Sequence, residues 1–245
     1  MKKYFDIYIE FDKNTIVEKI NNCIDKRQKG YVCVVDGNVL ATAQKQPQYK
    51  AIINGGLVNT CDGSSIALLA GFIHNSSFKT YTGPEIFSKY VKENYTQYFL
   101  GNTEENLDRL KSRFVELGYN TSNFKFESLP FKKVKDFDYK KIASEINFFS
   151  PDIIWVSLGA PKQEIFISKL IPFLDKSVLF AIGAAFNLFL GDDNNKRAPQ
   201  MMRNLHLEWL FRVFQEPKRV GKRAFSYLIL LPKLIYREVK TKNKN

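Results

Sequence analysis

The sequence is poor in cysteine and histidine and has no long apolar run. Its three cysteines, Cys23, Cys33 and Cys61, are an odd number without CxxC or Cys/His spacing. Neither a disulfide framework nor a zinc site is indicated, and reduced thiols in a cytosolic protein are expected. The two histidines, His74 and His206, have no partner at recognisable spacing and are expected to be structural. Without a stretch of about 18 apolar residues, no segment is expected to span a bilayer.

Acidic residues are scarce in one part of the chain. Residues 196–245 contain 13 Lys or Arg and three acids, a net charge of +10, whereas the whole chain carries +12. The basic character therefore belongs to the C-terminal segment, and it predicts an anionic partner, either nucleic acid or an anionic membrane surface. Within this segment the apolar run AFSYLILLPKLIY is short and is interrupted by Pro232 and Lys233. Such a pattern is typical of a helix that lies on a surface.

Apolar strands alternating with amphipathic helices make up most of the remaining sequence. Strand patterns occur at residues 31–35, 57–60, 98–100, 152–159 and 178–183, and helical spacing occurs at residues 15–24, 48–55, 105–119, 137–149 and 162–170. A polar segment, DGNVLATAQ, follows the first of these strands. Because the strands are apolar throughout, we expect an α/β fold, Rossmann-like in its second half, with a parallel sheet covered on both faces.

Glycines end three of these strands. Gly101, Gly159 and Gly183 would lie on the carboxyl edge of the sheet, where ligands bind in such folds. Glycine lets the backbone approach a ligand closely, and the start of the following helix favours phosphate. A glycine after a strand is more often only a turn, and the chain has no GxGxxG or GxxxxGK[ST] pattern. These turns alone leave nucleotide binding open.

The block Gly159-Ala160-Pro161-Lys162-Gln163-Glu164 resembles the G-x-P-K-Q-E signature of the WecG/TagA/CpsF glycosyltransferases. Further blocks resemble those of the family in order and spacing, at residues 182–186, 191, 197–199, 207–212 and 216–219, with Asp62-Gly63 and Gly83-Pro84-Glu85 nearer the N-terminus. The resemblance spans about residues 30–223. Its ordered blocks make it specific.

The resemblance implies transfer of a sugar from a UDP-sugar, of the N-acetylmannosamine type or related, onto a polyprenyl-diphosphate-linked sugar in bacterial surface glycan biosynthesis. In the family the reaction is thought to proceed with inversion, without a metal or cofactor, at the inner face of the cell membrane. A cytoplasmic protein attached peripherally to that face is therefore expected. Inverting transfer needs a general base for the acceptor hydroxyl and a means of stabilising the departing diphosphate.

Asp62 matches the position of the family's proposed base, at a point where a strand gives way to a helix. The alternative is that it only caps that helix or shapes the turn with Gly63. Gln163 and Glu164 are expected to contact the donor sugar or nucleotide. The alternative is that they only form a polar first helical turn, which favours the helix dipole. The residues expected to bind substrate are Asp36, Asn38, Gly101, Gly159, Pro161, Lys162, Gln163, Glu164, Gly183, Asn187, Arg197, Arg212, Arg219 and Arg223.

Two positions depart from the family pattern. Asp36-Gly37-Asn38 stands where the family usually shows Thr-x-Asn, and residues 79–82 offer no arginine before Gly83. Both changes alter the donor pocket, and Asp36 becomes a second candidate base. They motivate a rival hypothesis, a catalytically impaired, membrane-docked partner in a glycan assembly complex; a nucleotide-dependent enzyme of another class is a further alternative. The Asp192-Asp193 pair is interpreted as a polar loop, so no metal site is expected.

The chain is expected to divide into three parts. Residues 1–92 form an N-terminal α/β half that carries Asp62, residues 93–195 a Rossmann-like half that binds the nucleotide-sugar, and residues 196–245 a basic appendage. Guanidinium groups through Arg223 would close over the diphosphate, or else form a solvated or lipid-facing surface, and the part from Ala224 on would contact the membrane. No nucleic-acid reading motif is present. Exposed apolar residues in the appendage leave homo-oligomerisation open.

Overall fold

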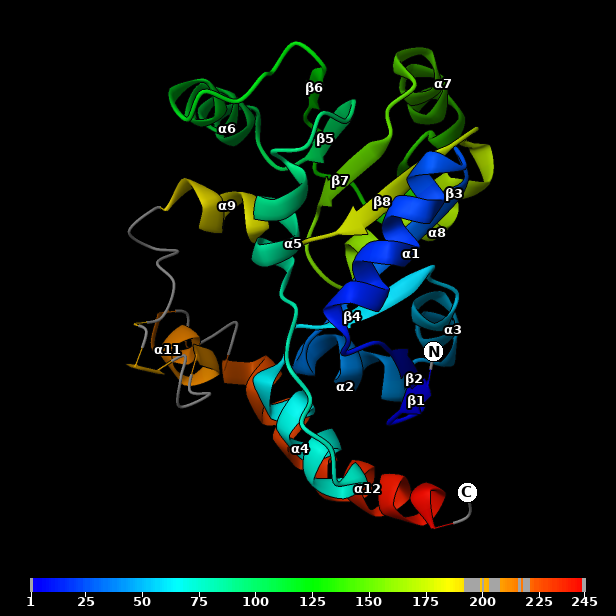
Figure 1. Ribbon diagram of the computed structural model, residues 1–245, viewed down its shortest axis with the longest axis vertical. Coiled ribbons are helices and arrows are strands. Elements are labelled where there is room, and N and C mark those ends of the chain that lie inside the picture. The colour runs from blue at the N-terminus through cyan, green and yellow to red at the C-terminus, as the bar shows by residue number, and fades with distance from the viewer. Residues whose placement is uncertain are drawn as a thin grey trace.

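A computed structural model describes residues 2–191, 199, 201–202, 208–215, 217 and 221–243. Its centre is a six-stranded parallel sheet with the strand order β4-β3-β8-β7-β5-β6 (Figure 1). The strands are β3 (Lys29–Val35), β4 (Val58–Cys61), β5 (Gln97–Gly101), β6 (Phe124–Glu127), β7 (Ile153–Ser157) and β8 (Ser177–Ala181). A two-stranded antiparallel hairpin, β1 (Lys2–Tyr4) and β2 (Ile7–Ile9), lies next to β4 through a bridge between Glu10 and Thr60.

Helices follow or precede each strand, and several begin at polar caps. Asp12 accepts a hydrogen bond from the Thr15 amide at 2.7 Å, and Thr82 forms a capping box with Glu85. The helices are α1 (Lys13–Asp25), α2 (Gly37–Lys45), α3 (Pro47–Asn54), α4 (Ser64–His74), α5 (Gly83–Tyr90), α6 (Glu104–Glu116), α7 (Tyr139–Phe149), α8 (Lys162–Leu170), α9 (Ala185–Leu190), α11 (Glu208–Gln215) and α12 (Lys222–Lys242), with short 3-10 turns at Val134–Asp136 and Ile171–Phe173.

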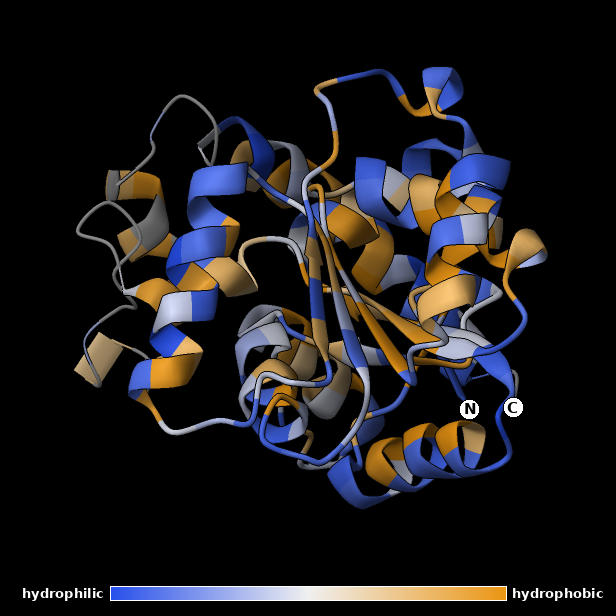
Figure 2. Ribbon diagram, turned by 90° about the horizontal axis from the view of Figure 1, so that it is seen from above, coloured by the Kyte–Doolittle hydropathy of each residue, from blue (hydrophilic) through white to orange (hydrophobic). Residues whose placement is uncertain are grey.

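Two apolar layers cover the sheet, because successive strand residues point to opposite faces. Ile154 and Val156 of β7 join the layer built with α2, α3, α4, α7, α8 and α12, whereas Ile153 and Trp155 join the layer built with α1, α5, α6 and α9. Figure 2 shows the apolar strands in the middle, between helices that carry polar residues on parts of their surface. The expected α/β fold with a parallel sheet buried on both faces is confirmed.

Most predicted elements lie where the patterns place them, and the helix at residues 162–170 has the expected bounds. The polar segment after the first strand was not predicted as a helix, yet it forms α2, because Asp36 caps it and Val39, Leu40 and Ala43 are buried. Strands from residues 1–92 and 93–195 belong to one sheet, in which β3 pairs with β8. The division of the chain at residues 92 and 195 stays a prediction.

Helix α12 lies on the surface of the body, against α2 and α4 (Figure 1). Tyr227, Leu234 and Glu238 on its inner side are buried. The helix continues through Pro232, which interrupts the apolar run of the sequence but not the helix. Proline removes one donor to the carbonyl four residues earlier, on Leu228, whose side chain is 48% exposed. Pro232 is exposed as well, so the proline lies on the outer side of the helix.

A buried polar contact fixes the end of α12 to the body. The Glu238 carboxylate accepts hydrogen bonds from the Phe5 amide at 2.6 Å and lies 2.8 Å from Nε2 of His74 in α4. Lys242 adds a hydrogen bond from its ammonium to the Ile73 carbonyl at 2.5 Å. His74 is thus structural, as expected, and its partner is 164 residues away in the sequence. His206 lies outside the described residues.

Candidate functional site

The carboxyl edge of the sheet brings together residues that are far apart in the sequence. Because the strands of the sheet are parallel, the residues after β3, β4, β5, β7 and β8 share this edge: Asp36, Asp62, Asn102, Leu158 with Gly159, and Ile182 with Gly183. Five of the described helices, α2, α4, α6, α8 and α9, begin there. The dipoles of these helices favour an anion at this edge.

The glycine turns on this edge have the backbone conformation that glycine allows. Gly101, Gly159 and Gly183 have φ values of +90°, +75° and +54°. A Cβ on Gly101 would lie 2.9 Å from the carbonyl oxygen of Ser157, so these two turns are in close contact. The sequence therefore identified three turns that require glycine for their conformation.

Hydrogen bonds join these turns into one network. The Asn102 amide donates to the Ser157 carbonyl at 3.0 Å, and the Ser157 hydroxyl donates to the Gly183 carbonyl at 2.7 Å. The Asn102 side-chain amide donates to Oδ1 of Asn187 at 3.0 Å. Asn187 is a predicted site residue, whereas Asn102 and Ser157 were missed. Their only sequence signal is a polar side chain at the end of an apolar strand.

Asp62 and Asp36 follow neighbouring strands at residues that pair in register, Val35 and Cys61. The Asp62 amide donates to the Val35 carbonyl at 3.0 Å, which fixes the turn against β3. Asp36 is the N-cap of α2, and its carboxylate accepts from the Val39 amide at 2.7 Å. The N-cap of α4 is Gly63, the residue after Asp62. Helix capping thus occupies the Asp36 carboxylate, and both carboxylates are partly exposed at the same edge.

The block at residues 159–164 forms the β7–α8 turn and the first turn of α8, with a cis peptide bond before Pro161. The Lys162 ammonium lies over two aromatic rings, 5.2 Å from the Phe131 centroid and 5.3 Å from that of Phe137. Gln163 is 4% exposed and Glu164 is 0% exposed. Burial raises the pKa of Glu164 to about 7.

Among the predicted arginines, the structure describes the Arg223 side chain. Arg223 is partly buried in the first turn of α12, one turn before Tyr227. The Tyr227 ring fits against Gly37 at the start of α2, where a Cβ would lie 3.1 Å from it, and Ser65 of α4 donates to the Tyr227 hydroxyl at 3.3 Å. Burial raises the pKa of Tyr227 to about 12. The start of α12 therefore adjoins the edge that carries both aspartates.

Of the remaining predicted residues, Asn38 is described by the structure and several others are not. Asn38 lies in the first turn of α2 and accepts, through its carbonyl, a hydrogen bond from Thr42 at 2.7 Å. The residues Arg197 and Arg219, the side chain of Arg212, and the Asp192-Asp193 pair lie outside the described residues. Within residues 2–191 and the described parts beyond, no group of three or more His, Cys, Asp or Glu is placed to hold a metal ion.

The arrangement can support group transfer to a hydroxyl. It offers a carboxylate on a fixed turn as a base, and helix N-termini with nearby cations for a charged leaving group. Comparison with known proteins agrees with this chemistry. Residues 4–245 match the model of the family described as "Glycosyl transferase WecG/TagA/CpsF family".

Three relatives of the chain carry the same enzyme name. The chain is 25% identical to a Bacillus spizizenii protein named N-acetylglucosaminyldiphosphoundecaprenol N-acetyl-beta-D-mannosaminyltransferase, over 80% of this chain and 75% of that protein. Proteins with this name from Staphylococcus aureus strains MW2 and NCTC 8325 are each 25% identical, over 96% of this chain and 92% of theirs.

Proposed function

Because this chain belongs to the WecG/TagA/CpsF family of glycosyl transferases, we propose that it moves an N-acetylmannosamine-type sugar from a UDP-sugar onto a polyprenyl-diphosphate-linked sugar. The relatives are named as enzymes that act on an N-acetylglucosaminyl-diphosphoundecaprenol. One observation in the structure carries the proposal: Asp62 and the helix N-termini lie on the same edge of the sheet. Such an edge offers a base and an anion site for one reaction.

In the proposed reaction Asp62 accepts the proton of the acceptor hydroxyl as its oxygen attacks the anomeric carbon of the donor. The bond between that carbon and the diphosphate breaks from the opposite side, so the configuration inverts and UDP leaves. The growing charge on the diphosphate is stabilised by the starts of α6, α8 and α9 and by cations such as Lys162. Asp36, whose carboxylate accepts the Val39 amide as the cap of α2, is the second candidate for the base.

The polyprenyl chain of the acceptor lies in a membrane, and we place the docking surface on α4 and α12. Both helices leave large apolar side chains exposed: Leu68 and Phe72 on α4, and Phe225, Leu228, Ile229 and Tyr236 on α12. Phe72 is 89% exposed. Four exposed cations of α12, Lys222, Lys233, Arg237 and Lys240, complement an anionic headgroup layer. None of the described helices is both long and apolar enough to cross a bilayer.

This surface modifies the expectation for the appendage. From Ala224 on, one face of the helix packs on the body through Tyr227 and Leu234, and the opposite face is exposed. Because α12 packs against α4 and both helices expose apolar side chains, the proposed docking surface also includes α4, which belongs to the body. We propose that the protein attaches peripherally to the inner face of the cell membrane through both helices.

Turnover with a panel of UDP-sugars and a lipid-diphosphate-N-acetylglucosamine acceptor tests the reaction. Loss of a general base lowers rates by about 10²- to 10⁴-fold, so Asp62→Asn should release UDP at least about 100-fold more slowly. Asp12→Asn is the matched control, because it makes the same change at the cap of α1, where asparagine also caps well. Full activity of Asp62→Asn would remove it as the base. A native chain that releases no UDP across the panel would instead favour the binding-partner hypothesis.

Flotation with liposomes that contain anionic lipid tests the docking surface. Phe72→Asp should reduce the bound fraction, because it removes apolar contact and adds a charge that the headgroups repel. Phe148→Asp is the control, since Phe148 is 95% exposed but belongs to α7. Equal binding of the two variants would contradict the assignment of this surface.

A further inference from the structure

The carboxyl group of Glu164 is fully enclosed by the protein, although it belongs to a block that the sequence associates with substrate. Its residue is 0% exposed at the third position of α8. A carboxyl in such a place is costly unless hydrogen bonds compensate it. Because Glu164 is buried, any effect that it has on a ligand must pass through a neighbouring residue.

That neighbour is Gln163. The side-chain amide of Gln163 donates to Oε1 of Glu164 at 2.9 Å, and Oε1 of Gln163 accepts from the Gly159 amide at 3.0 Å. A backbone N–H can only donate, so the oxygen of the carboxamide faces Gly159 and its nitrogen faces Glu164. A Cβ on Gly183 would lie 3.6 Å from this carboxamide. Gln163 therefore lies between two of the glycine turns on the carboxyl edge.

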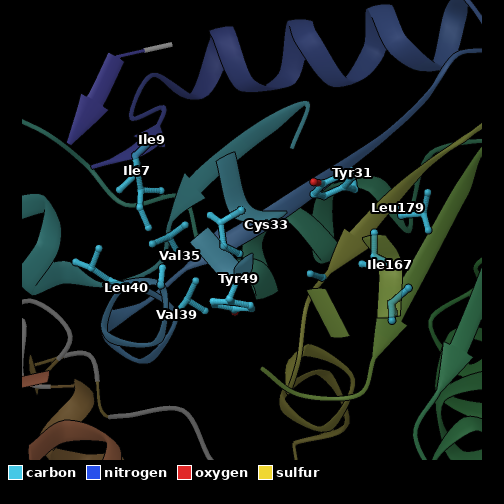
Figure 3. Close-up of a cluster of buried hydrophobic side chains, with 14 of the residues drawn as sticks. Ile7, Ile9, Tyr31, Cys33, Val35, Val39, Leu40, Tyr49, Ile167 and Leu179 are labelled. Atoms are coloured by element: carbon cyan, nitrogen blue, oxygen red, sulfur yellow. The ribbon is translucent and has the colours of Figure 1, made fainter. Parts of the chain in front are cut away.

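The surroundings of Glu164 explain why it holds this position. Tyr49 of α3 and Cys33 of β3 lie in the same apolar cluster, with Val35 and Val39 beside them (Figure 3). Cys33, Tyr49 and Asp36 are the titratable groups that interact with Glu164 from these elements. The hydrogen bond from the Gln163 side chain to this carboxyl links the two residues.

We infer that Glu164 is a positioning residue, which holds the Gln163 carboxamide so that its second N–H reaches a diphosphate oxygen between the Gly159 and Gly183 turns. This inference rests on the proposed function, since that function supplies the diphosphate. It assigns different roles to two adjacent residues that the sequence placed together in the substrate site. Gln163 touches the ligand, and Glu164 sets the direction of Gln163.

Calorimetric binding of UDP to the full chain tests the inference without turnover. Gln163→Ala should bind UDP at least about tenfold more weakly, because the variant loses a hydrogen bond to a charged group. Glu164→Met should produce the same loss, because Gln163 then has no acceptor for its amide. The double variant should bind no more weakly than either single variant. Losses that multiply in the double variant, or native affinity in Glu164→Met, would overturn the inference.

Glu164→Gln keeps the size of the side chain and an acceptor oxygen, so it should bind UDP within about threefold of the native chain. A folded Glu164→Gln chain with the weak binding of Gln163→Ala would also overturn the inference, whatever Glu164→Met does. Failure of the proposed function gives a different result: the native chain itself then binds no UDP.

Discussion

The buried carboxyl of Glu164 predicts how the stability of the protein depends on pH. Burial raises its pKa from 4.5 to about 7, so the folded protein binds this proton more tightly than the unfolded chain does. The stability from this group is fully present below pH 4.5 and is lost as the pH rises through 7. A shift of that size corresponds to about 3 kcal/mol of unfolding free energy, at 1.36 kcal/mol per pH unit.

Urea denaturation at several pH values between 5 and 8 measures this effect. The native chain should lose about 2.5 kcal/mol relative to Glu164→Gln as the pH rises across this range, because glutamine does not titrate. Glu18→Gln, on the exposed side of α1, is the control and should give a profile parallel to that of the native chain. A constant difference between native and Glu164→Gln profiles would refute the reasoning.

Two further predictions concern the attachment of α12. Glu238→Ala leaves the buried Phe5 amide without its acceptor and removes the contact with His74, so the free energy of unfolding in urea should fall by about 1–3 kcal/mol; an unchanged value would show that this contact does not hold the helix. Gly37→Ala places a methyl group 3.1 Å from the Tyr227 ring, and the displaced helix should be cut faster by a protease near its start. Cleavage at the native rate would mean that the ring moves aside freely.

Much of the fold follows from the sequence because the apolar runs of the strands and the helical spacing of apolar residues are clear. The apolar run at Ile153–Ser157 is a strand buried on both faces, and Thr103 caps α6, with its hydroxyl 3.3 Å from the Asn106 amide. The short edge strand β6 has no such strong pattern. Phe124–Glu127 is half-buried and carries polar residues, so its pairing with β5 decides its conformation.

The candidate site was only partly accessible to sequence reasoning. The glycine turns and Asp62 could be placed on one edge, because the carboxyl ends of parallel strands share an edge. The capping role of Asp36 depends on α2, which the polar composition concealed. The contact between Tyr227 and Gly37 joins residues far apart in the chain, and no local pattern reports it. The same holds for Glu238 and His74.

The linkage of the product tests the central claim most directly. UDP-sugars of this class carry an α-linked sugar, and attack from the face opposite the diphosphate inverts that centre. With UDP-N-acetylmannosamine and the lipid-diphosphate-N-acetylglucosamine acceptor, the proton NMR spectrum of the released disaccharide should therefore show a β linkage, at a yield that Asp62→Asn lowers at least about 100-fold. An α-linked product, or no disaccharide from the native chain, would contradict the account.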